Sequence, residues 1–513
     1  VVERTIDSNT VTTIELFTPL DWGDDPNYCW FVDGGGTGMG YQPGVTEILG
    51  DYPTLRAATA QADPGLTHTT PIATFQDLYD NLQPAIGIIT AFAYYSPTQT
   101  KVTTSTPHGV SASDNIIIEN SVNYNGSQTG YRIDDYNLRI LKVFVGDDAS
   151  GIVYADKYID AAVSKTLYLT QNIDASETSS PAFLDGNGWV SVNGFNGSFD
   201  GSGYKITNLY QNRTYCGGLF GKDRYGCTIA NLTIEDANIY APGAGVLAYW
   251  LQAGSLNRAY LFYNCHTSGN ITLTGSDLNY WNYDGTGGLI GALAGTSTYK
   301  TFVYDCTSDV NINGNADNGY HTETGDGTSG YFGGLIGYFP TTDSATYSHM
   351  EIHNCSASGN LDLKAAVGGN GIYTVGGLVG FLSYQNCKIY DSHATGSVKG
   401  DRIVGGFDGQ NTSAAQITRC YATGNVEAYR NTAGGFSGSA SGLYTDCYAW
   451  GNVVSAGDYV GGFFGSVGNY LAACPHLYSI GQVTGVGSNV GGFLGYRSSY
   501  TTFSNCYWDT ETS

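Results

Sequence analysis

The stretch Gly376-Gly377-Leu378-Val379-Gly380 is one copy of a pentapeptide, Gly-Gly-apolar-x-Gly, that recurs through the last two-thirds of this chain. Other copies begin at Gly217, Gly287, Gly333, Gly405, Gly434, Gly461 and Gly491, and a degenerate copy begins at Ala244. Neighbouring copies start 27 to 30 residues apart, or 43 to 46 residues apart where an insertion intervenes. A fixed period of this length is typical of solenoids, in which each repeat is one structural unit.

A second motif keeps the same period, as in Cys355-Ser-Ala-Ser-Gly-Asn-Leu361. The cysteine of this motif recurs at Cys265, Cys306, Cys420 and Cys447; Ser392 and Leu477 replace it in two copies, and Cys506 opens an incomplete one. Each repeat thus offers three short apolar segments, separated by Gly or Asn. We therefore predict an all-β chain whose residues 166–513 form a parallel β-helix of about nine three-strand coils. The corner glycines are expected to supply positive φ and to let the backbone corners close tightly.

This segment resembles the GLUG-motif repeat family. Leu167–Asp174 (LYLTQNID), Phe195–Gly201 (FNGSFDG) and Tyr204–Leu209 (YKITNL) match the lead-in of that family in order. Cys506–Ser513 (CYWDTETS) is similar to the family's common ending, which usually runs further, so the resemblance implies a solenoid truncated at Ser513. Members are mostly surface proteins of bacteria, archaea and phages, some with a zinc protease domain. The resemblance therefore implies an extracellular place on a cell or virion surface.

Residues 1–94 form an N-terminal region with few signals. Val11–Phe17 alternates as a strand does. Phe75–Leu82 (FQDLYDNL) is expected to be a short helix with Thr74 as its N-cap. We therefore expect mixed secondary structure ahead of the first β-rich module.

Residues 95–165 are expected to form a small β-module. Lys101–Val110 (KVTTSTPHGV) and Asp114–Glu119 (DNIIIE) resemble a module that recurs in phage virion and other appendage proteins. Ala112-Ser113 stands where that module usually has a glycine before the aspartate. A generic β-sandwich spacer explains the same pattern equally well.

The charge and composition favour an extracellular protein that does not bind nucleic acid. The chain has 45 acidic and 21 basic residues, a net charge of −24, which repels phosphate backbones and anionic membranes. No apolar stretch reaches the length of a membrane-spanning helix, so no membrane insertion is expected. A hydrophobic content of 41% argues against disorder.

No catalytic, cofactor-binding or metal-binding residue is predicted. The sequence lacks the zinc-protease signature His-Glu-x-x-His. His349 and His353 have the i, i+4 spacing of a helical metal pair, but the repeat register makes their segment a strand. Asp305, Asp391 and Asp446 precede the cysteine position in separate coils, which favours a turn role over a catalytic pair.

The acidic insertion Ser276–Thr286 offers a weak alternative, a Ca²⁺ site. Its oxygen ligands would come from Asp277, Asn279, Asn282 and Asp284. The spacing does not fit an EF-hand loop, and Asx turns in a solvated loop explain it more simply. This insertion and Asn311–Gly330 are both expected to loop out from one corner.

Eleven cysteines are an odd number, so at least one is unpaired or pairs outside this chain. The in-register cysteines are expected to point inward as a ladder, with neighbouring Cα atoms about 5 Å apart, within reach of a disulfide. A buried stack of thiols is the alternative, because free cysteine packs as a small apolar residue. Cys216 and Cys227 flank one turn and are a candidate pair. Off the ladder also lie Cys29, Cys387 and Cys474.

These features predict a non-enzymatic extracellular structural or adhesive protein, such as a subunit of a surface filament. The alternatives are a phage tail-fibre or spike component and a carbohydrate-active β-helix enzyme. The expected partners are copies of this chain or other appendage subunits. Glycans are a further class, because the 41 tyrosines offer flat amphipathic faces, although strand propensity accounts for these tyrosines equally well.

Overall fold

The computed structural model describes residues 31–32, 38–39 and 68–510, with gaps inside the last range. The longest gaps are 156–165, 275–284, 316–328 and 340–349. The expected strand Val11–Phe17 and the residues of the candidate Ca²⁺ loop lie outside the described part. The short strands β1 (Phe31–Val32) and β2 (Gly38–Met39) pair with each other in antiparallel fashion.

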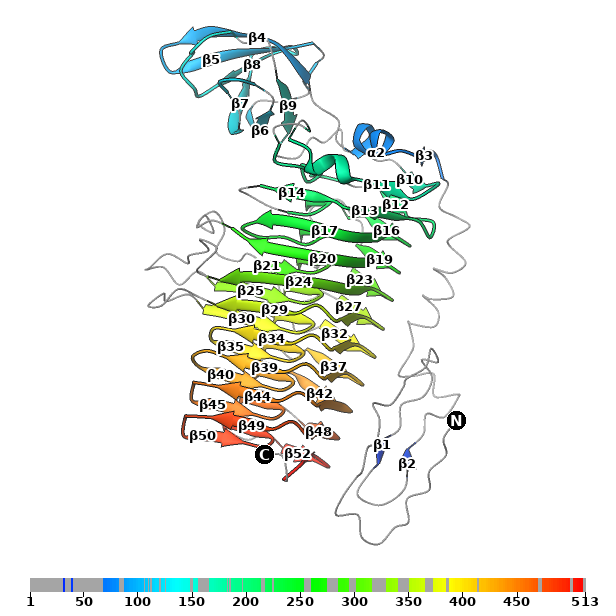
Figure 1. Cartoon of the computed structure of the whole chain (residues 1–513), viewed down its shortest axis with the longest axis vertical. Coiled ribbons are helices and arrows are strands. Elements are labelled where there is room, and N and C mark those ends of the chain that lie inside the picture. Colours follow the sequence, from blue (N-terminus) through cyan, green and yellow to red (C-terminus); the bar gives the residue numbers. More distant parts are fainter. Residues whose placement is uncertain are drawn as a thin grey trace.

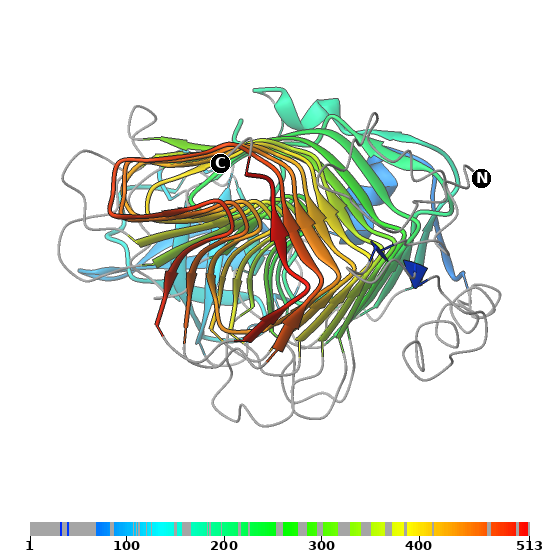
Figure 2. The same cartoon turned by 90° about the horizontal axis from the view of Figure 1, so that it is seen from below.

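Most of the described chain is a rod of stacked parallel strands, which confirms the parallel β-helix (Figure 1). Viewed from below in Figure 2, the coils lie over one another and enclose a common interior. We number the four long sheets 1 to 4 in the order in which one coil visits them. Sheet 4 has nine strands in the described residues, in agreement with the expected nine repeats.

Sheet 1 carries the strand that precedes each cysteine position. Its members are β3 (Thr70–Ile72), β10 (Thr166–Leu169), β12 (Ser198–Asp200), β16 (Thr228–Ala230), β19 (Leu261–Tyr263), β23 (Thr301–Tyr304), β27 (Met350–His353), β32 (Cys387–Tyr390), β37 (Gln416–Thr418) and β42 (Leu443–Thr445). A separate parallel pair consists of β47 (Ala473–Pro475) and β52 (Thr502–Ser504).

Sheet 2 carries the segments on either side of the Gly-Asn dipeptide of the cysteine motif. Its members are β11 (Ile173–Asp174), β13 (Lys205–Thr207), β14 (Tyr210–Asn212), β17 (Thr233–Ala241), β20 (His266–Leu273), β24 (Thr307–Asn315), β28 (Ser356–Ala357), β29 (Leu361–Lys364), β33 (His393–Ala394), β34 (Val398–Gly400), β38 (Tyr421–Ala422), β39 (Val426–Ala428), β43 (Cys447–Ala449), β44 (Val453–Ser455), β48 (Leu477–Ser479), β49 (Val483–Gly485) and β53 (Tyr507–Trp508).

In each coil, the strand of sheet 3 comes just before the Gly-Gly turn and the strand of sheet 4 comes just after it. Sheet 3 contains β21 (Gly285–Gly287), β25 (Ser329–Gly333), β30 (Ile372–Gly376), β35 (Ile403–Gly405), β40 (Thr432–Gly434), β45 (Tyr459–Gly461) and β50 (Asn489–Gly491). Sheet 4 contains β15 (Phe220–Asp223), β18 (Ala248–Gln252), β22 (Ile290–Ala294), β26 (Ile336–Phe339), β31 (Val379–Leu382), β36 (Asp408–Asn411), β41 (Ser437–Ala440), β46 (Phe464–Val467) and β51 (Leu494–Arg497).

A complete coil such as β32 to β36 therefore contains five short strands rather than the three expected. Glycines cause the additional breaks. In sheet 2 a Cβ on Gly396 would lie 2.0 Å from the carbonyl oxygen of Gly359, so the chain bends there and one apolar segment becomes two strands. The Gly405-Gly406 turn likewise separates β35 from β36.

The last glycine of the pentapeptide lies where two backbones nearly touch. A Cβ on Gly380 would lie 2.3 Å from Gly337 O and 2.6 Å from Phe332 N, both in the preceding coil. Positive φ is not recorded for Gly380. Close backbone approach, the second role expected of these glycines, is thus what requires glycine at this position. Positive φ occurs in the first copy of the pentapeptide, where Gly218 has a φ of 140°.

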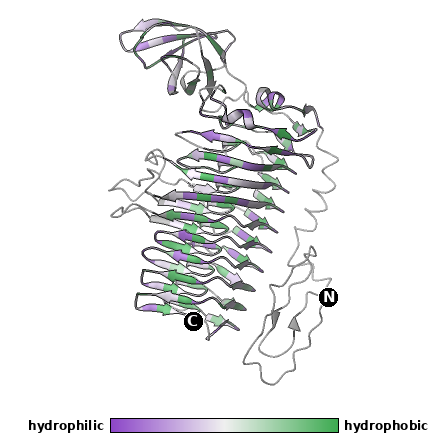
Figure 3. Cartoon of the chain, viewed as in Figure 1, coloured by the Kyte–Doolittle hydropathy of each residue, from purple (hydrophilic) through white to green (hydrophobic). Residues whose placement is uncertain are grey.

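The interior of the solenoid is one continuous apolar core. All four sheets contribute to it: Ile352 of sheet 1, Ile312 of sheet 2, Val375 of sheet 3 and Val379 of sheet 4 are each at most 1% exposed. Figure 3 shows hydrophobic residues recurring from coil to coil along the whole rod. Because each inward row continues into the next coil, removal of one coil would expose the apolar surface of its neighbours.

The N-terminal end of the rod is covered by a helix, α2 (Phe75–Leu82). This confirms the expected helix, and Thr74 caps it, since Thr74 Oγ1 accepts the Asp77 N–H at 3.0 Å. Leu78 and Leu82 are fully buried in the solenoid core. Phe75 also packs edge-on against Trp189, at a ring distance of 6.3 Å. A short 3₁₀ helix, Ser176–Ser179, lies in the same end coil.

A closed antiparallel barrel is inserted between the first two strands of sheet 1, which pair with each other as β3 and β10. Its strands are β4 (Gly87–Ser96), β5 (Gln99–Thr104), β6 (Ser113–Glu119), β7 (Gly126–Arg132), β8 (Asn137–Ile140) and β9 (Ile152–Ala155). In Figure 1 it lies beyond the N-terminal end of the rod. The expected boundary at residues 94 and 95 is corrected accordingly, because β4 begins at Gly87 and β3 belongs to the solenoid.

The histidine of the motif Lys101–Val110 has a structural role in the barrel. His108 is buried, its Nδ1 accepts the Val110 N–H at 3.1 Å, and its Nε2 lies 3.2 Å from Asn137 O. Phe92 and Tyr124 stack in the barrel core with their ring centres 4.1 Å apart.

In the solenoid, the insertion expected at Asn311–Gly330 is shorter than predicted, because β24 runs to Asn315 and β25 begins at Ser329. No helix in the described residues is long and apolar enough to span a membrane.

Candidate functional site

A ladder of aromatic rings lies on the outer face of sheet 2 in the last coils. The rings of His393 and Tyr421 stack at 4.6 Å, and those of Tyr421 and Tyr448 stack at 4.9 Å with only 6° between their planes. Tyr478 and Tyr507 follow in the same register. These side chains point outward because the residue after each one, such as Ala422 or Ala449, points into the core.

A groove of about 590 Å³ lies beside this ladder, where sheet 2 bends between its two strand segments. One wall is formed by Thr423, Trp450 and Ile480, and the other by Asn425, Asn452 and Gln482; Gly451 and Gly481 line the floor. The walls come from successive coils, since Ala422 pairs with Ala449 and Ala449 pairs with Ser479.

The floor of the groove is bare backbone. A Cβ on Gly451 would lie 1.8 Å from Gly424 O, and a Cβ on Gly481 would lie 1.9 Å from Gly451 O. Stacked coils therefore permit only glycine at this position. The missing side chains leave a channel open along the axis of the rod.

One wall of the groove is a ladder of amides with a fixed orientation. The side-chain oxygen of Asn425 accepts the backbone N–H of Asn452 at 2.9 Å. The side-chain oxygen of Asn452 accepts the backbone N–H of Gln482, also at 2.9 Å. Because these oxygens bind backbone donors, the NH₂ groups of both asparagines are directed to the outside. They have no partner among the described residues, and neither does the Gln482 amide.

The opposite wall provides an aromatic ring. Trp450 is half-buried, and its indole N–H has no hydrogen-bond partner in the described part of the chain. Thr423 and Ile480 flank it in the coils before and after. All the lining residues are uncharged, so the groove combines one aromatic face with several outward donors.

A second polar cluster lies inside the solenoid. Asp408 is completely buried, and its Oδ2 accepts hydrogen bonds from Ser437 Oγ at 2.7 Å and from the Tyr444 hydroxyl at 3.1 Å. Burial raises the pKa of the Asp408 carboxyl to about 7, while the two hydroxyl donors oppose this shift. Burial also raises the pKa of Tyr444 well above its ordinary value. The cluster is closed off from solvent, so it is a structural feature and not an active site.

Only one of the two histidines with helical metal-pair spacing, His353, lies in the described part of the chain, and it lies in a strand. His353 ends strand β27, as the repeat register predicted, whereas His349 lies outside the described residues. The His353 ring lies between Tyr304 and Tyr390, at 4.9 and 4.7 Å, and its Nε2 is 3.5 Å from Glu351 Oε2. No group of three metal-binding side chains occurs in the part of the chain that the structure describes.

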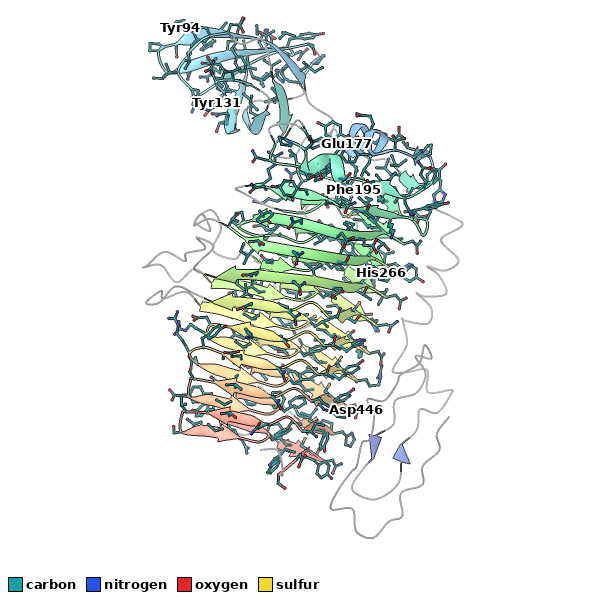
Figure 4. All side chains as sticks on the ribbon, viewed as in Figure 1. Tyr94, Tyr131, Glu177, Phe195, His266 and Asp446 are labelled. Atoms are coloured by element: carbon teal, nitrogen blue, oxygen red, sulfur yellow. The ribbon has the colours of Figure 1, made fainter. Side chains whose placement is uncertain are left out.

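The recurrent aspartates have the turn role that their positions predicted. Asp305, Asp391 and Asp446 have φ values of 53°, 51° and 55°, in the left-handed region that Asn and Asp tolerate best. Each carboxylate binds the equivalent residue of the next coil, and Asp391 does so through two hydrogen bonds of 2.6 and 2.8 Å from Arg419. Figure 4 shows His266 and Asp446 along the same edge of the rod.

The cysteines form the buried thiol stack and not a disulfide ladder. The described cysteines are all free, and all but the half-buried Cys506 are buried. In the stack, the Cys265 N–H lies 3.5 Å from Cys306 Sγ, and the Cys355 N–H donates to Ser392 Oγ at 3.1 Å. Cys227 is one of the free thiols, which argues against the candidate pair of Cys216 and Cys227. Cys29 and Cys216 themselves lie outside the described residues.

Comparisons with known proteins include a local sequence match and weak structural matches. No family model matches the chain. Halomucin of Haloquadratum walsbyi is 30% identical over 244 residues, which are 47% of this chain and 2% of halomucin. This chain therefore spans only a very small part of the curated relative.

The structural matches carry the names of proteases. A candidate immunoglobulin A1 protease from Bacteroides ovatus matches with a TM-score of 0.34 and 19% identity, over 65% of this chain and 77% of the other. An IgA1 protease matches with a TM-score of 0.36 and 16% identity, over 78% of this chain and 29% of the other. At such TM-scores the likeness carries no argument about activity.

Sequence reasoning missed both the groove and the buried carboxylate. Signals for both exist in the repeat. Trp450 replaces the small residue that Cys420-Tyr-Ala-Thr423 has at the same position, and Asp408 replaces the apolar fourth residue of the pentapeptide. A comparison of the repeats column by column would have marked both positions.

Proposed function

We propose that this chain is an extracellular surface protein with a structural and adhesive role and no catalytic one. The observation that carries the proposal is the ladder of outward aromatic rings beside an uncharged groove on a rigid rod. Outward rings in register lose little side-chain entropy when a partner binds, because the stacked strands already fix them. A rod that displays such a face is suited to holding a partner at a distance.

Two further observations support the proposal. The resemblance to the GLUG-motif repeat family favours a surface location. The local similarity to halomucin, whose name places it among mucin-like proteins, is in keeping with an extracellular role. Self-association and docking to other appendage subunits stay predictions.

Immunogold labelling of intact cells of the source organism tests the location. Antibodies against the barrel and against the solenoid should both label the outside of unpermeabilised cells. Label that appears only after permeabilisation would overturn the surface assignment.

A parallel assay tests the absence of catalysis. Purified protein incubated with a panel of polysaccharides should release no reducing ends above those released by a boiled sample. Time-dependent release would replace the adhesive role with a carbohydrate-active enzyme, the alternative on this fold.

A further inference from the structure

We propose that the groove lined by Trp450, Asn452 and Gln482 binds an uncharged carbohydrate chain that runs along the axis of the rod. This inference rests on the proposed adhesive function and names its ligand class. Four properties of the groove lead to it. These are its aromatic face, its row of amide donors, its uncharged lining and the backbone hydrogen bonds beside its floor.

The aromatic face suits the apolar side of a sugar ring. Trp450 is half-buried at the wall of the groove, and Tyr448 lies two residues before it on the same outer face of sheet 2. Trp and Tyr combine a large apolar ring with a polar tip, so they pack against C–H groups while adjacent hydroxyls remain hydrogen-bonded. A ligand with alternating C–H faces and hydroxyls meets both requirements.

The donors of the groove repeat with the coils. The NH₂ groups of Asn425 and Asn452 stand in successive coils about 4.8 Å apart, the spacing of neighbouring strands. The Gln482 amide continues the row in the next coil. A row of identical donors at a constant step fits a polymer with hydroxyl and ring oxygens at regular intervals better than a single small molecule.

The charges argue for a neutral polymer. The groove lining carries no charged residue, and the net charge of −24 disfavours acidic polysaccharides. Further along the outer surface, Lys399 forms an ion pair with Glu427 at 3.2 Å. Arg430 forms one with Asp401 at 2.8 Å. Neither cation is therefore available to attract an anionic chain.

The backbone hydrogen bonds beside the floor of the groove argue against an added peptide strand. A peptide joins a sheet by pairing with open backbone groups at an edge. Here the N–H groups of Trp450 and Ile480 already donate to Ala422 O at 2.8 Å and Ala449 O at 3.1 Å. The strands on both sides of the groove are also paired with those of the next coil, so a peptide finds no open strand edge here.

The proposal is tested with the full chain on an array of neutral and acidic glycans, followed by calorimetric titration of the best neutral oligosaccharide. Trp450→Ala should weaken binding by about 10-fold or more, because one ring contact is worth about 1.4 kcal/mol. Trp450→Phe, which keeps an aromatic face, should retain most of the affinity. Gln482→Ala should weaken binding by about 3-fold, the loss expected for one neutral hydrogen bond.

Tyr204→Ala is the matched control, since Tyr204 is an exposed aromatic residue, 38% accessible, in a distant coil. It should bind as the wild type does, and unchanged circular dichroism and melting temperature of all variants confirm folding. Absence of neutral-glycan binding, binding that Trp450→Ala leaves unchanged, or preference for acidic glycans or for peptides would each overturn the proposal. If one of these occurs while immunogold still labels intact cells, the groove assignment fails and the surface role stands.

Discussion

The Tyr444 hydroxyl donates a hydrogen bond of 3.1 Å to Asp408 Oδ2 inside the solenoid. Asp408 stands in an inward row of sheet 4 in which Ile336 and Val379 precede it and Phe464 follows. Ser437, the residue between Asp408 and Phe464 in that row, provides the second donor at 2.7 Å. A carboxyl group thus replaces an aliphatic side chain in the core, with two hydroxyls in place of water.

This arrangement predicts a pH-dependent stability. The folded pKa of Asp408 is raised from 3.8 to about 7, so its stabilising contribution is complete below 3.8 and is lost as the pH rises towards 7. Relative to the Asp408→Asn variant, the wild type should lose about 4 kcal/mol of unfolding free energy over this range. Thermal melts of both proteins at several pH values measure the difference. Melting temperatures that shift in parallel would contradict the buried ionisation.

The close backbone contact at Gly380 predicts a large effect of a single methyl group. Gly380→Ala places a Cβ 2.3 Å from the carbonyl oxygen of Gly337, and neither backbone can move without displacing its coil. We expect a loss of about 3 kcal/mol of unfolding free energy. Gly468→Ala is the control, because its nearest neighbour is the mobile Ser441 hydroxyl. Equal denaturation midpoints for the two variants would refute the packing account.

The corner pair Asp391 and Arg419 predicts a measurable interaction between coils. Both side chains are less than one-third exposed, and two hydrogen bonds join them. A double-mutant cycle with Asp391→Ala and Arg419→Ala should give an interaction energy of about 1 kcal/mol at low salt, decreasing at high salt. Additive effects of the two substitutions would show that the bridge contributes nothing.

The buried cysteines, both in the thiol stack and outside it, predict slow and ordered alkylation. Burial raises the pKa of Cys387 to about 12 and that of Cys474 to about 11, so few thiolates are available to react. Among the described cysteines of the native protein, Cys506 should react first, because it is half-buried whereas the others are buried. After denaturation without reductant, peptide mapping should find every described cysteine labelled. A described cysteine that is labelled only after reduction would establish a disulfide.

The sequence predicted the features that the period controls. The number of coils, the inward cysteines, the capped helix at Phe75–Leu82 and the turn role of Asp391 all follow from residues that recur or lie close together in the chain. The insertion of the barrel could not be predicted in this way, because β3 and β10 pair across nearly a hundred residues. The five strands per coil were missed because the splitting of sheet 2 depends on contact between the glycines of adjacent coils.

The candidate groove was hidden for a related reason. Its lining residues belong to three coils, and no single repeat contains more than a few of them. Gly and Asn were expected only to separate the apolar segments of a repeat, whereas in the stacked structure Gly451 forms the floor of the groove and Asn452 forms a wall. Only the register of the coils brings Trp450 beside this row of amides.

Hydrogen–deuterium exchange of the full chain, with and without neutral polysaccharides, tests the central claim most directly. The account predicts that a bound polysaccharide slows exchange in 421–426, 448–453 and 478–483, the segments that carry the aromatic ladder and the groove. It also predicts unchanged exchange in the barrel strands β4 to β9. Protection confined to other segments, or none with any neutral polysaccharide, would contradict the assignment of this face as the binding surface.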